Sequence, residues 1–320
     1  MSLSSYILRR FLRNPSEALR MKRAADEVRE YIVWKLHTVL ERENLFSHLA
    51  TQPWWSLADK QLAKIVGDVL AEEGFAKWQG DVLVMKDFPK KPTITTAEAA
   101  DMVPLIDRAL EFLPIALLTG AKPSEEEARA LKAKILDNFA VRLEFESAIE
   151  VAELDKLGRE AVIADVFPRI GASTLTLLEQ TVAKVVVIEP HAQNLETIKS
   201  LIKLHQLEER VSYVLNPLER ISLDKPVDAV FMGETIHWLS NPRLTLASIR
   251  SILKPGGILA IAQSLYSSVG LAASLPGYLV GALRPPPTSD ELRDLLRGAG
   301  FKVDKWLESM GVALVRAVTA

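Results

Sequence analysis

The feature that most constrains the fold is a change of hydrophobic period at about residue 161. From there on, short apolar runs alternate with segments of helix length, as in a parallel sheet covered by helices on both faces. The first five runs span residues 161–164, 185–188, 211–215, 227–232 and 258–262. Two more, at 301–307 and 312–318, are joined by a short turn that predicts a closing hairpin. We therefore expect an α/β unit with a seven-stranded sheet over residues 161–320.

The turn before the fifth run is the most specific motif in the chain. A helical segment ends at Leu253, and Lys254-Pro255-Gly256-Gly257 then leads into the apolar run from Ile258. Proline stops the helix and the two glycines allow a sharp turn. Upstream, the fourth run is followed by Ile236-His237-Trp238. This order resembles the class I, Rossmann-like methyltransferases that use S-adenosylmethionine, and it is most similar to their O-methyltransferase branch, which carries an N-terminal winged-helix dimerisation domain.

The resemblance implies a cofactor site at the ends of the first strands. The first strand ends at Asp165, where the family has an acidic residue followed by a glycine-rich turn. Here that turn contains Phe167, Pro168 and Arg169, and only Gly171 remains of the expected glycines. One interpretation is that the cofactor site has decayed and Phe167 fills it. The other is that a reshaped loop still binds the cofactor, with Arg169 pairing with its carboxylate.

The next three strand ends supply the other cofactor residues that the resemblance implies. Glu189 follows the second strand and would accept hydrogen bonds from both ribose hydroxyls, although an acid there can also be an ordinary helix cap. Asn216 follows the third strand and would meet the adenine amine through its carbonyl oxygen. Gly233 follows the fourth strand.

His237 is the candidate catalytic residue. In the O-methyltransferase branch a histidine at this place is the general base that takes the proton from a substrate hydroxyl. In other relatives a histidine stands here without that role, so both interpretations stay open. The apolar segment 263–287 that follows the fifth strand would cover the acceptor in the family, but it can equally be a core helix or a dimer contact.

The N-terminal part has a helical pattern. Residues 4–43 carry apolar positions at helical spacing, broken at Asn14-Pro15, and a helix over 56–73 is followed by a hairpin through Gln79-Gly80-Asp81, which is typical of a winged helix. Its candidate recognition helix has too few positive charges to favour nucleic acid. We predict a winged-helix-like dimerisation domain over 1–120, a connecting helix over 121–160, the methyltransferase domain over 161–320, and a homodimer.

The composition excludes several other classes of protein and of site. The chain has 320 residues, a formal charge of -2 and no cysteine, which excludes disulfides, thiolate zinc sites and cysteine nucleophiles, and we predict no metal site. An uncharged apolar run of membrane-spanning length is absent, and the N-terminus has no signal-peptide pattern, so we expect a cytoplasmic protein without a membrane anchor.

Two functions follow from these patterns. The first is transfer of a methyl group from S-adenosylmethionine to a hydroxyl or amine of a small molecule. The alternative is a non-catalytic protein that keeps the methyltransferase fold as a binding or assembly module. A dinucleotide oxidoreductase is disfavoured by the closing hairpin and by the Lys254-Pro255-Gly256-Gly257 turn.

Overall fold

The structure is a computed structural model that describes residues 15–319. Its contacts divide the chain into two compact units. The first unit contains residues 139–265 and 287–319, and the second contains residues 15–138 and 266–286. The domain boundaries predicted at residues 120 and 160 remain a prediction. The start of the predicted N-terminal helix, residues 4–14, lies outside the described residues.

The first unit is built on the expected seven-stranded sheet. Its strands are β3 (Val162–Val166), β4 (Lys184–Glu189), β5 (Val211–Leu215), β6 (Val227–Gly233), β7 (Leu253–Ser264), β8 (Phe301–Ser309) and β9 (Val312–Thr319). They lie in the order β5-β4-β3-β6-β7-β9-β8. The first five pair in parallel, and β9 pairs antiparallel with both β7 and β8. The α/β fold and the closing hairpin are thus confirmed.

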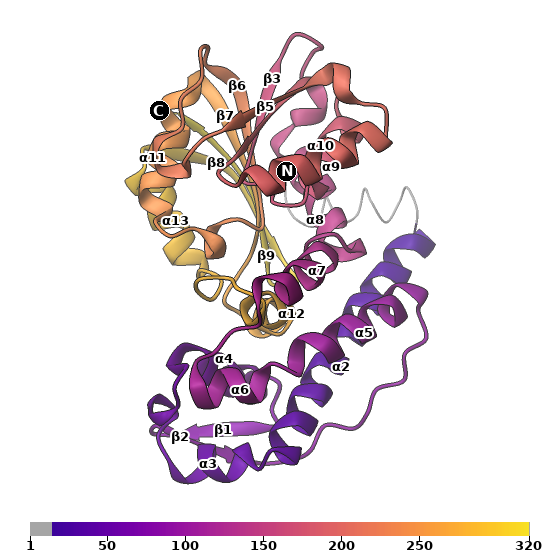
Figure 1. Ribbon diagram of the computed structural model, residues 1–320, viewed down its shortest axis with the longest axis vertical. Coiled ribbons are helices and arrows are strands. Elements are labelled where there is room, and N and C mark those ends of the chain that lie inside the picture. Colours follow the sequence, from indigo (N-terminus) through magenta and orange to yellow (C-terminus); the bar gives the residue numbers. More distant parts are fainter. Residues whose placement is uncertain (1–14, 320) are drawn as a thin grey trace. The chain divides into compact units, whose positions relative to one another are not determined.

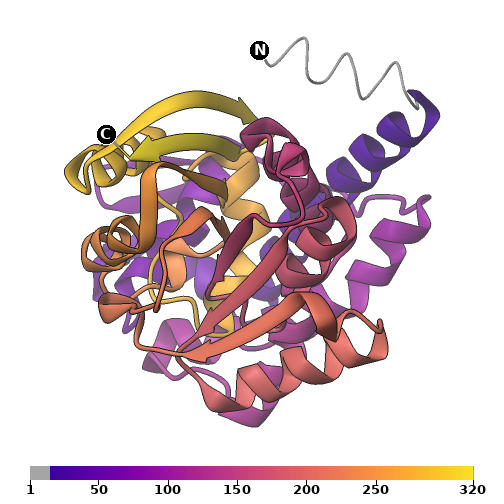
Figure 2. The same cartoon turned by 90° about the horizontal axis from the view of Figure 1, so that it is seen from above.

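Helices cover both faces of this sheet (Figure 1). One side carries α8 (Phe139–Ala152), α9 (Ala172–Gln180) and α10 (Ala192–Leu204), and the other carries α11 (Pro242–Ile252) and α13 (Ser289–Gly298). Figure 2 shows β8 and β9 at one edge and β5 at the other. The parallel strands therefore have their carboxyl ends on one side of the unit, where ligands bind in open α/β sheets.

Gly233, at the end of β6, lets α8 approach the sheet. The ring of Phe145 in α8 is fully buried and meets Phe231 of β6 edge-on, with 5.7 Å between ring centroids. A Cβ on Gly233 would lie only 2.4 Å from the Phe145 ring. The glycine thus has a packing role, whatever its part in ligand binding.

The second unit is mainly helical. Its elements are α2 (Pro15–Arg42), α3 (Leu45–Thr51), α4 (Lys60–Glu72), the hairpin β1 (Ala76–Gln79) and β2 (Val82–Met85), α5 (Ala97–Leu110), α6 (Leu113–Thr119), α7 (Glu125–Leu136) and α12 (Ser268–Leu279). The predicted helix over 56–73 and its hairpin are therefore present as α4, β1 and β2. None of the helices in residues 15–319 is long and apolar enough to span a bilayer.

Helix α12 completes the core of the second unit. Its residues Leu271, Leu275 and Leu279 are fully buried in the same hydrophobic cluster as α2 and α4. The apolar segment after the fifth strand is therefore a core helix, which was one of the interpretations left open by the sequence. Most apolar positions of α2, among them Ile32 and Leu36, are buried in this core as well.

Glu27 anchors the start of α5, and its replacement gives a first prediction. Its buried carboxylate accepts hydrogen bonds from the backbone N–H and hydroxyl groups of Thr95 and Thr96. Burial raises the pKa of Glu27, but these bonds outweigh it and lower the pKa to about 2. We expect Glu27→Gln to cost about 2 kcal/mol at pH 7, since the charge-assisted bonds are lost. Chemical unfolding at pH 7 measures it, with the exposed Glu30→Gln on the same helix as control.

The lowered pKa of Glu27 also sets the pH dependence of the destabilisation by Glu27→Gln. A carboxyl whose pKa is lowered by folding stabilises the protein above its unfolded pKa and loses that contribution as the pH falls. The difference between wild type and Glu27→Gln should therefore shrink between about pH 4.5 and pH 2. An equal difference at pH 7 and pH 2.5 would contradict the account.

Candidate functional site

The loop between β3 and α9 has an unusual backbone. Phe167 and Arg169 both have left-handed φ angles, 60° and 59°, with Pro168 between them. For side-chain-bearing residues this conformation costs roughly 1 kcal/mol or more each. The loop is tied to the neighbouring strand by a hydrogen bond of 2.8 Å from Phe167 N to the Ile188 carbonyl. Tertiary contacts therefore hold residues of ordinary size in a backbone that suits glycine.

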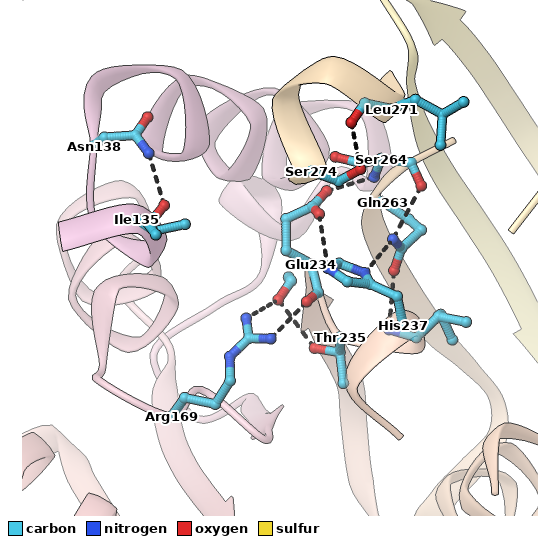
Figure 3. Close-up of polar contacts among 12 residues, drawn as sticks. Ile135, Asn138, Arg169, Glu234, Thr235, His237, Gln263, Ser264, Leu271 and Ser274 are labelled. Carbon is cyan, nitrogen blue, oxygen red and sulfur yellow. Dashed lines mark hydrogen bonds and ion pairs between the residues drawn. The ribbon is translucent and has the colours of Figure 1, made fainter. Parts of the chain in front are cut away.

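The side chain of Arg169 points toward the carboxyl end of β6 (Figure 3). Its Nη1 donates to the Glu234 carbonyl at 2.6 Å and its Nη2 to the Gly233 carbonyl at 2.8 Å. The guanidinium lies 5.5 Å from the ring centroid of Phe167 and 5.4 Å from that of Trp238. Burial lowers the pKa of Arg169 to about 10, against the effect of nearby carboxylates. The group is therefore a buried cation held by two carbonyls and two aromatic faces.

Glu189 is fully buried, and its carboxylate is already hydrogen-bonded. Oε2 accepts from the backbone N–H of Arg169 at 3.1 Å. Oε1 accepts from His191 N at 3.2 Å and from Asn194 Nδ2 at 2.9 Å. Burial raises the pKa of Glu189, while these donors oppose the rise. The predicted ribose clamp thus holds the loop and the start of α10 together.

Asp165 and Gly171 organise the N-terminus of α9. The Asp165 carboxylate is buried and accepts hydrogen bonds from the hydroxyls of Ser173 and Thr174, the shortest at 2.7 Å. Burial raises its pKa to about 7 in spite of these bonds. Gly171 precedes the helix with φ 92°, and a Cβ there would lie 3.1 Å from Leu201. The local structure therefore explains the residue types at both positions.

Asn216 lies beside Glu189 but is engaged in its own loop. Its backbone N–H donates to the Glu189 carbonyl at 3.3 Å. Its side-chain Oδ1 accepts from Ser222 N at 3.1 Å, and its Nδ2 donates to the Leu215 carbonyl at 3.2 Å. The structure therefore brings Arg169, Glu189 and Gly233 into direct hydrogen-bond contact, and it places Asn216 next to them with its side chain turned to Ser222 and Leu215.

His237 is buried in a hydrogen-bond chain that fixes its tautomer. Gln263 accepts the backbone N–H of Ile236 through Oε1 at 2.9 Å, so its amide group faces the ring. Gln263 Nε2 lies 2.9 Å from His237 Nδ1 and donates to it, which places the ring proton on Nε2. Burial, and then the charge of Arg169, lower the pKa of His237 to about 3. A neutral imidazole with its proton on Nε2 is better suited to donate a hydrogen bond than to act as a base.

Glu234 is the acid next to this imidazole. Its Oε2 lies 3.9 Å from His237 Nε2, and its Oε1 accepts the backbone N–H of Ser264. Burial raises its pKa to about 7. Glu144 of α8 interacts with the same side chain, and burial together with the charge of Glu234 raises the pKa of Glu144 well above the usual range. Two interacting carboxyls that are both buried disfavour the state in which both are ionised.

Sequence reasoning missed Glu234, Glu144 and Gln263. Glu234 carries the same signal that identified Glu189, since it is an acidic residue directly after a buried strand. Gln263 ends the fifth apolar run in the same way. Glu144 lies within a helix, and nothing in its sequence neighbourhood distinguishes it from the other acids of α8.

The comparisons with known proteins agree with this geometry. Residues 169–261 match a family model described as a methyltransferase domain. No curated protein matches the chain. The DszA carbon methyltransferase is 16% identical and superposes with a TM-score of 0.66, over 98% of this chain and 93% of that one.

Two further solved structures are similar over nearly the whole chain. The CurJ carbon methyltransferase is 15% identical, with a TM-score of 0.63 over 99% of this chain and 96% of that one. An O-methyltransferase family 2 protein from Planctomyces limnophilus, in complex with apigenin, is 14% identical, with a TM-score of 0.60 over 93% and 95%.

These findings define the class of fold. The first unit has the class I methyltransferase fold, with the sheet order and the closing hairpin of that class, and residues 169–261 within it match a methyltransferase domain. The matched domain identifies S-adenosylmethionine as the cofactor that goes with this fold. The similar structures include carbon and oxygen methyltransferases alike, so the acceptor class is a separate question.

The residues at the sheet end do not fit S-adenosylmethionine as they stand. The carboxylate of Glu189 is covered, and the carbonyls of Gly233 and Glu234 are taken by Arg169. Phe167 stands where the family has its first glycine, and its ring lies 6.2 Å from that of His191. The loop would have to move before the cofactor could reach these groups.

Proposed function

We propose that the chain is an S-adenosylmethionine-dependent methyltransferase that acts on a hydroxyl or amine group of a small molecule. The observation that carries the proposal is the buried chain Glu234, His237 and Gln263 at the carboxyl ends of β6 and β7. A hydroxyl or amine loses a proton when it is methylated, and a carboxyl with a pKa near neutrality is suited to take it.

Within this proposal Glu234 is the proton acceptor. His237 carries its proton on Nε2, 3.9 Å from the acid, and positions the acid through this electrostatic contact. This differs from the base role, which is one of the two interpretations that the sequence leaves open. Gln263 is a positioning residue, because its amide keeps the ring in the Nε2–H tautomer. The cytoplasmic location expected from the sequence belongs to the same proposal.

Methyl transfer to a panel of small phenols, alcohols and amines tests the function directly. Methyl-labelled S-adenosylmethionine is the donor, and apigenin is included because the Planctomyces limnophilus protein binds it. Glu234→Gln should lower the rate by roughly a hundredfold or more, since a positioned acid or base contributes that much. The matched control is Glu219→Gln, at a half-buried carboxylate that accepts a hydrogen bond from Ser240. A Glu234→Gln enzyme as fast as wild type would remove Glu234 from the mechanism.

A non-catalytic binding or assembly module is the second candidate. The covered Glu189 and the Arg169 contacts favour it, since both keep the cofactor out. The discriminating measurement is calorimetric titration of the chain with S-adenosylhomocysteine, the demethylated cofactor. Absence of binding by the wild type and by variants with an opened loop would favour the module.

A homodimer is a further part of the proposal and gives a second prediction. The apolar positions of the N-terminal helix favour a dimer in the sequence, but α2 buries most of them in its own unit. Exposed apolar side chains remain at Leu19, Ile115 and Leu118. Light scattering of the full chain should give about twice the mass of 35.5 kDa, and a monomeric mass would contradict the expectation.

A further inference from the structure

We infer that the carbonyls of Gly233 and Glu234, together with the Trp238 ring, form a binding site for an organic cation, and that Arg169 occupies this site in place of the cationic amino-acid part of the cofactor. The inference rests on the proposed function, because it states that the cofactor displaces Arg169 from this site. It assigns the Phe167-Pro168-Arg169 loop the role of an internal, displaceable ligand.

The chemistry of the pocket around the guanidinium is that of cation recognition. Two carbonyl oxygens converge on it at 2.6 and 2.8 Å, and the rings of Phe167 and Trp238 lie within 5.5 Å. Carbonyl dipoles and aromatic faces both stabilise a positive charge in a buried place. Two of these partners, the carbonyls, belong to the backbone at the end of β6 and would remain there if Arg169 left.

The fit of Arg169 to this site is incomplete. Its Nε is buried and donates to no group within the described part of the chain. The loop reaches the site only with Phe167 and Arg169 in left-handed conformations. An internal ligand that leaves one donor unsatisfied and strains its own backbone can be displaced by a ligand that does neither.

Two nucleoside ligands of nearly equal volume test the charge. S-adenosylhomocysteine carries an ammonium group, whereas its deaminated analogue keeps the adenosine, the thioether and the carboxylate and has no cation. Arg169→Gly removes the guanidinium and suits the φ of 59° at this position. It should raise the affinity for S-adenosylhomocysteine about tenfold or more and change that for the deaminated analogue by less than about threefold. Arg169→Met, which keeps an unbranched side chain and loses the charge, should show the same preference.

Arg210 provides the matched control. Its guanidinium also donates to two backbone carbonyls, of Thr181 and Leu178, at the other end of α9. Arg210→Ala should leave both affinities unchanged. Equal gains for the two ligands in Arg169→Gly would show that the loop acts by volume and would overturn the cation assignment. A loss of affinity in Arg169→Gly would overturn it too, and would make Arg169 a ligand of the cofactor carboxylate.

A measurement without the cofactor separates the two hypotheses. Millimolar ethylguanidinium should raise the Tm of Arg169→Gly more than that of wild type, because it refills the site. If neither wild type nor Arg169→Gly binds S-adenosylhomocysteine, the proposed function fails. The rise of the Tm with ethylguanidinium still shows whether the cation site exists. A Tm that ethylguanidinium raises equally in both chains, or in neither, would overturn the inference.

Discussion

Replacing Glu144 by glutamine is expected to make the chain more stable at pH 8 by about 2 kcal/mol, and to change its stability at pH 5 little. The carboxyls of Glu144 and Glu234 are buried against each other, and both pKa values are raised. A carboxyl with a raised pKa binds a proton in the folded chain that the unfolded chain has lost. The stability of wild type therefore falls as the pH rises above about 4.5, the usual pKa of both carboxyls.

Glutamine at 144 removes the part of this penalty that belongs to Glu144, because its amide can donate to Glu234 without titrating. Melting temperatures at pH 5 and pH 8 give the result, and Glu150→Gln on the same helix controls for the loss of one charge. Arg169 and His237 also face the pair, so the comparison is best made with both retained. A Glu144→Gln chain less stable than wild type at pH 8 would show that the pair is ionised and otherwise compensated.

Removal of the Glu189 carboxylate is expected to have two effects. Glu189→Ala leaves the backbone N–H groups of Arg169 and His191 and the side chain of Asn194 without their buried acceptor, which should lower the free energy of unfolding by about 3 kcal/mol. If Glu189 also clamps the ribose, the affinity for S-adenosylhomocysteine should fall roughly a hundredfold.

Urea unfolding and calorimetric titration separate these effects, with the exposed Glu179→Ala of α9 as the control. A destabilised variant with unchanged affinity would make Glu189 a structural residue only. A variant as stable as wild type would mean that the three donors find other partners, and the loop would then have to rest on Arg169 alone.

The sequence predicts the sheet well because its signals are local. The five parallel strands overlap the predicted apolar runs. Lys254-Pro255-Gly256-Gly257, predicted as a turn, lies within β7, where the register of this strand against β6 shifts. The break at Asn14-Pro15 and the helix over 56–73 are signals of the same kind, and the structure has α2 starting at Pro15 and α4 within that range. Such features depend on neighbours in the chain.

The site is harder to predict because its contacts join distant residues. The sequence identifies Arg169 as a departure from a glycine-rich turn, but the carbonyls that its guanidinium reaches are more than 60 residues away. The tautomer of His237 is set by Gln263, on another strand. Glu144 becomes noteworthy only because α8 places it beside Glu234. Residue type is enough to find the candidates, whereas their roles depend on the tertiary structure.

The place of α12 in the chain sets an order for folding during synthesis. This helix belongs to the core of the second unit, yet it follows β7 of the first unit in sequence. A chain that leaves the ribosome from its N-terminus exposes most of the mainly helical unit first, but that unit lacks Leu271, Leu275 and Leu279 until the parallel strands of the other unit have been made. The unit that begins first is therefore completed only after five strands of the other unit have been made, and neither unit can be produced intact from one uninterrupted stretch of its gene.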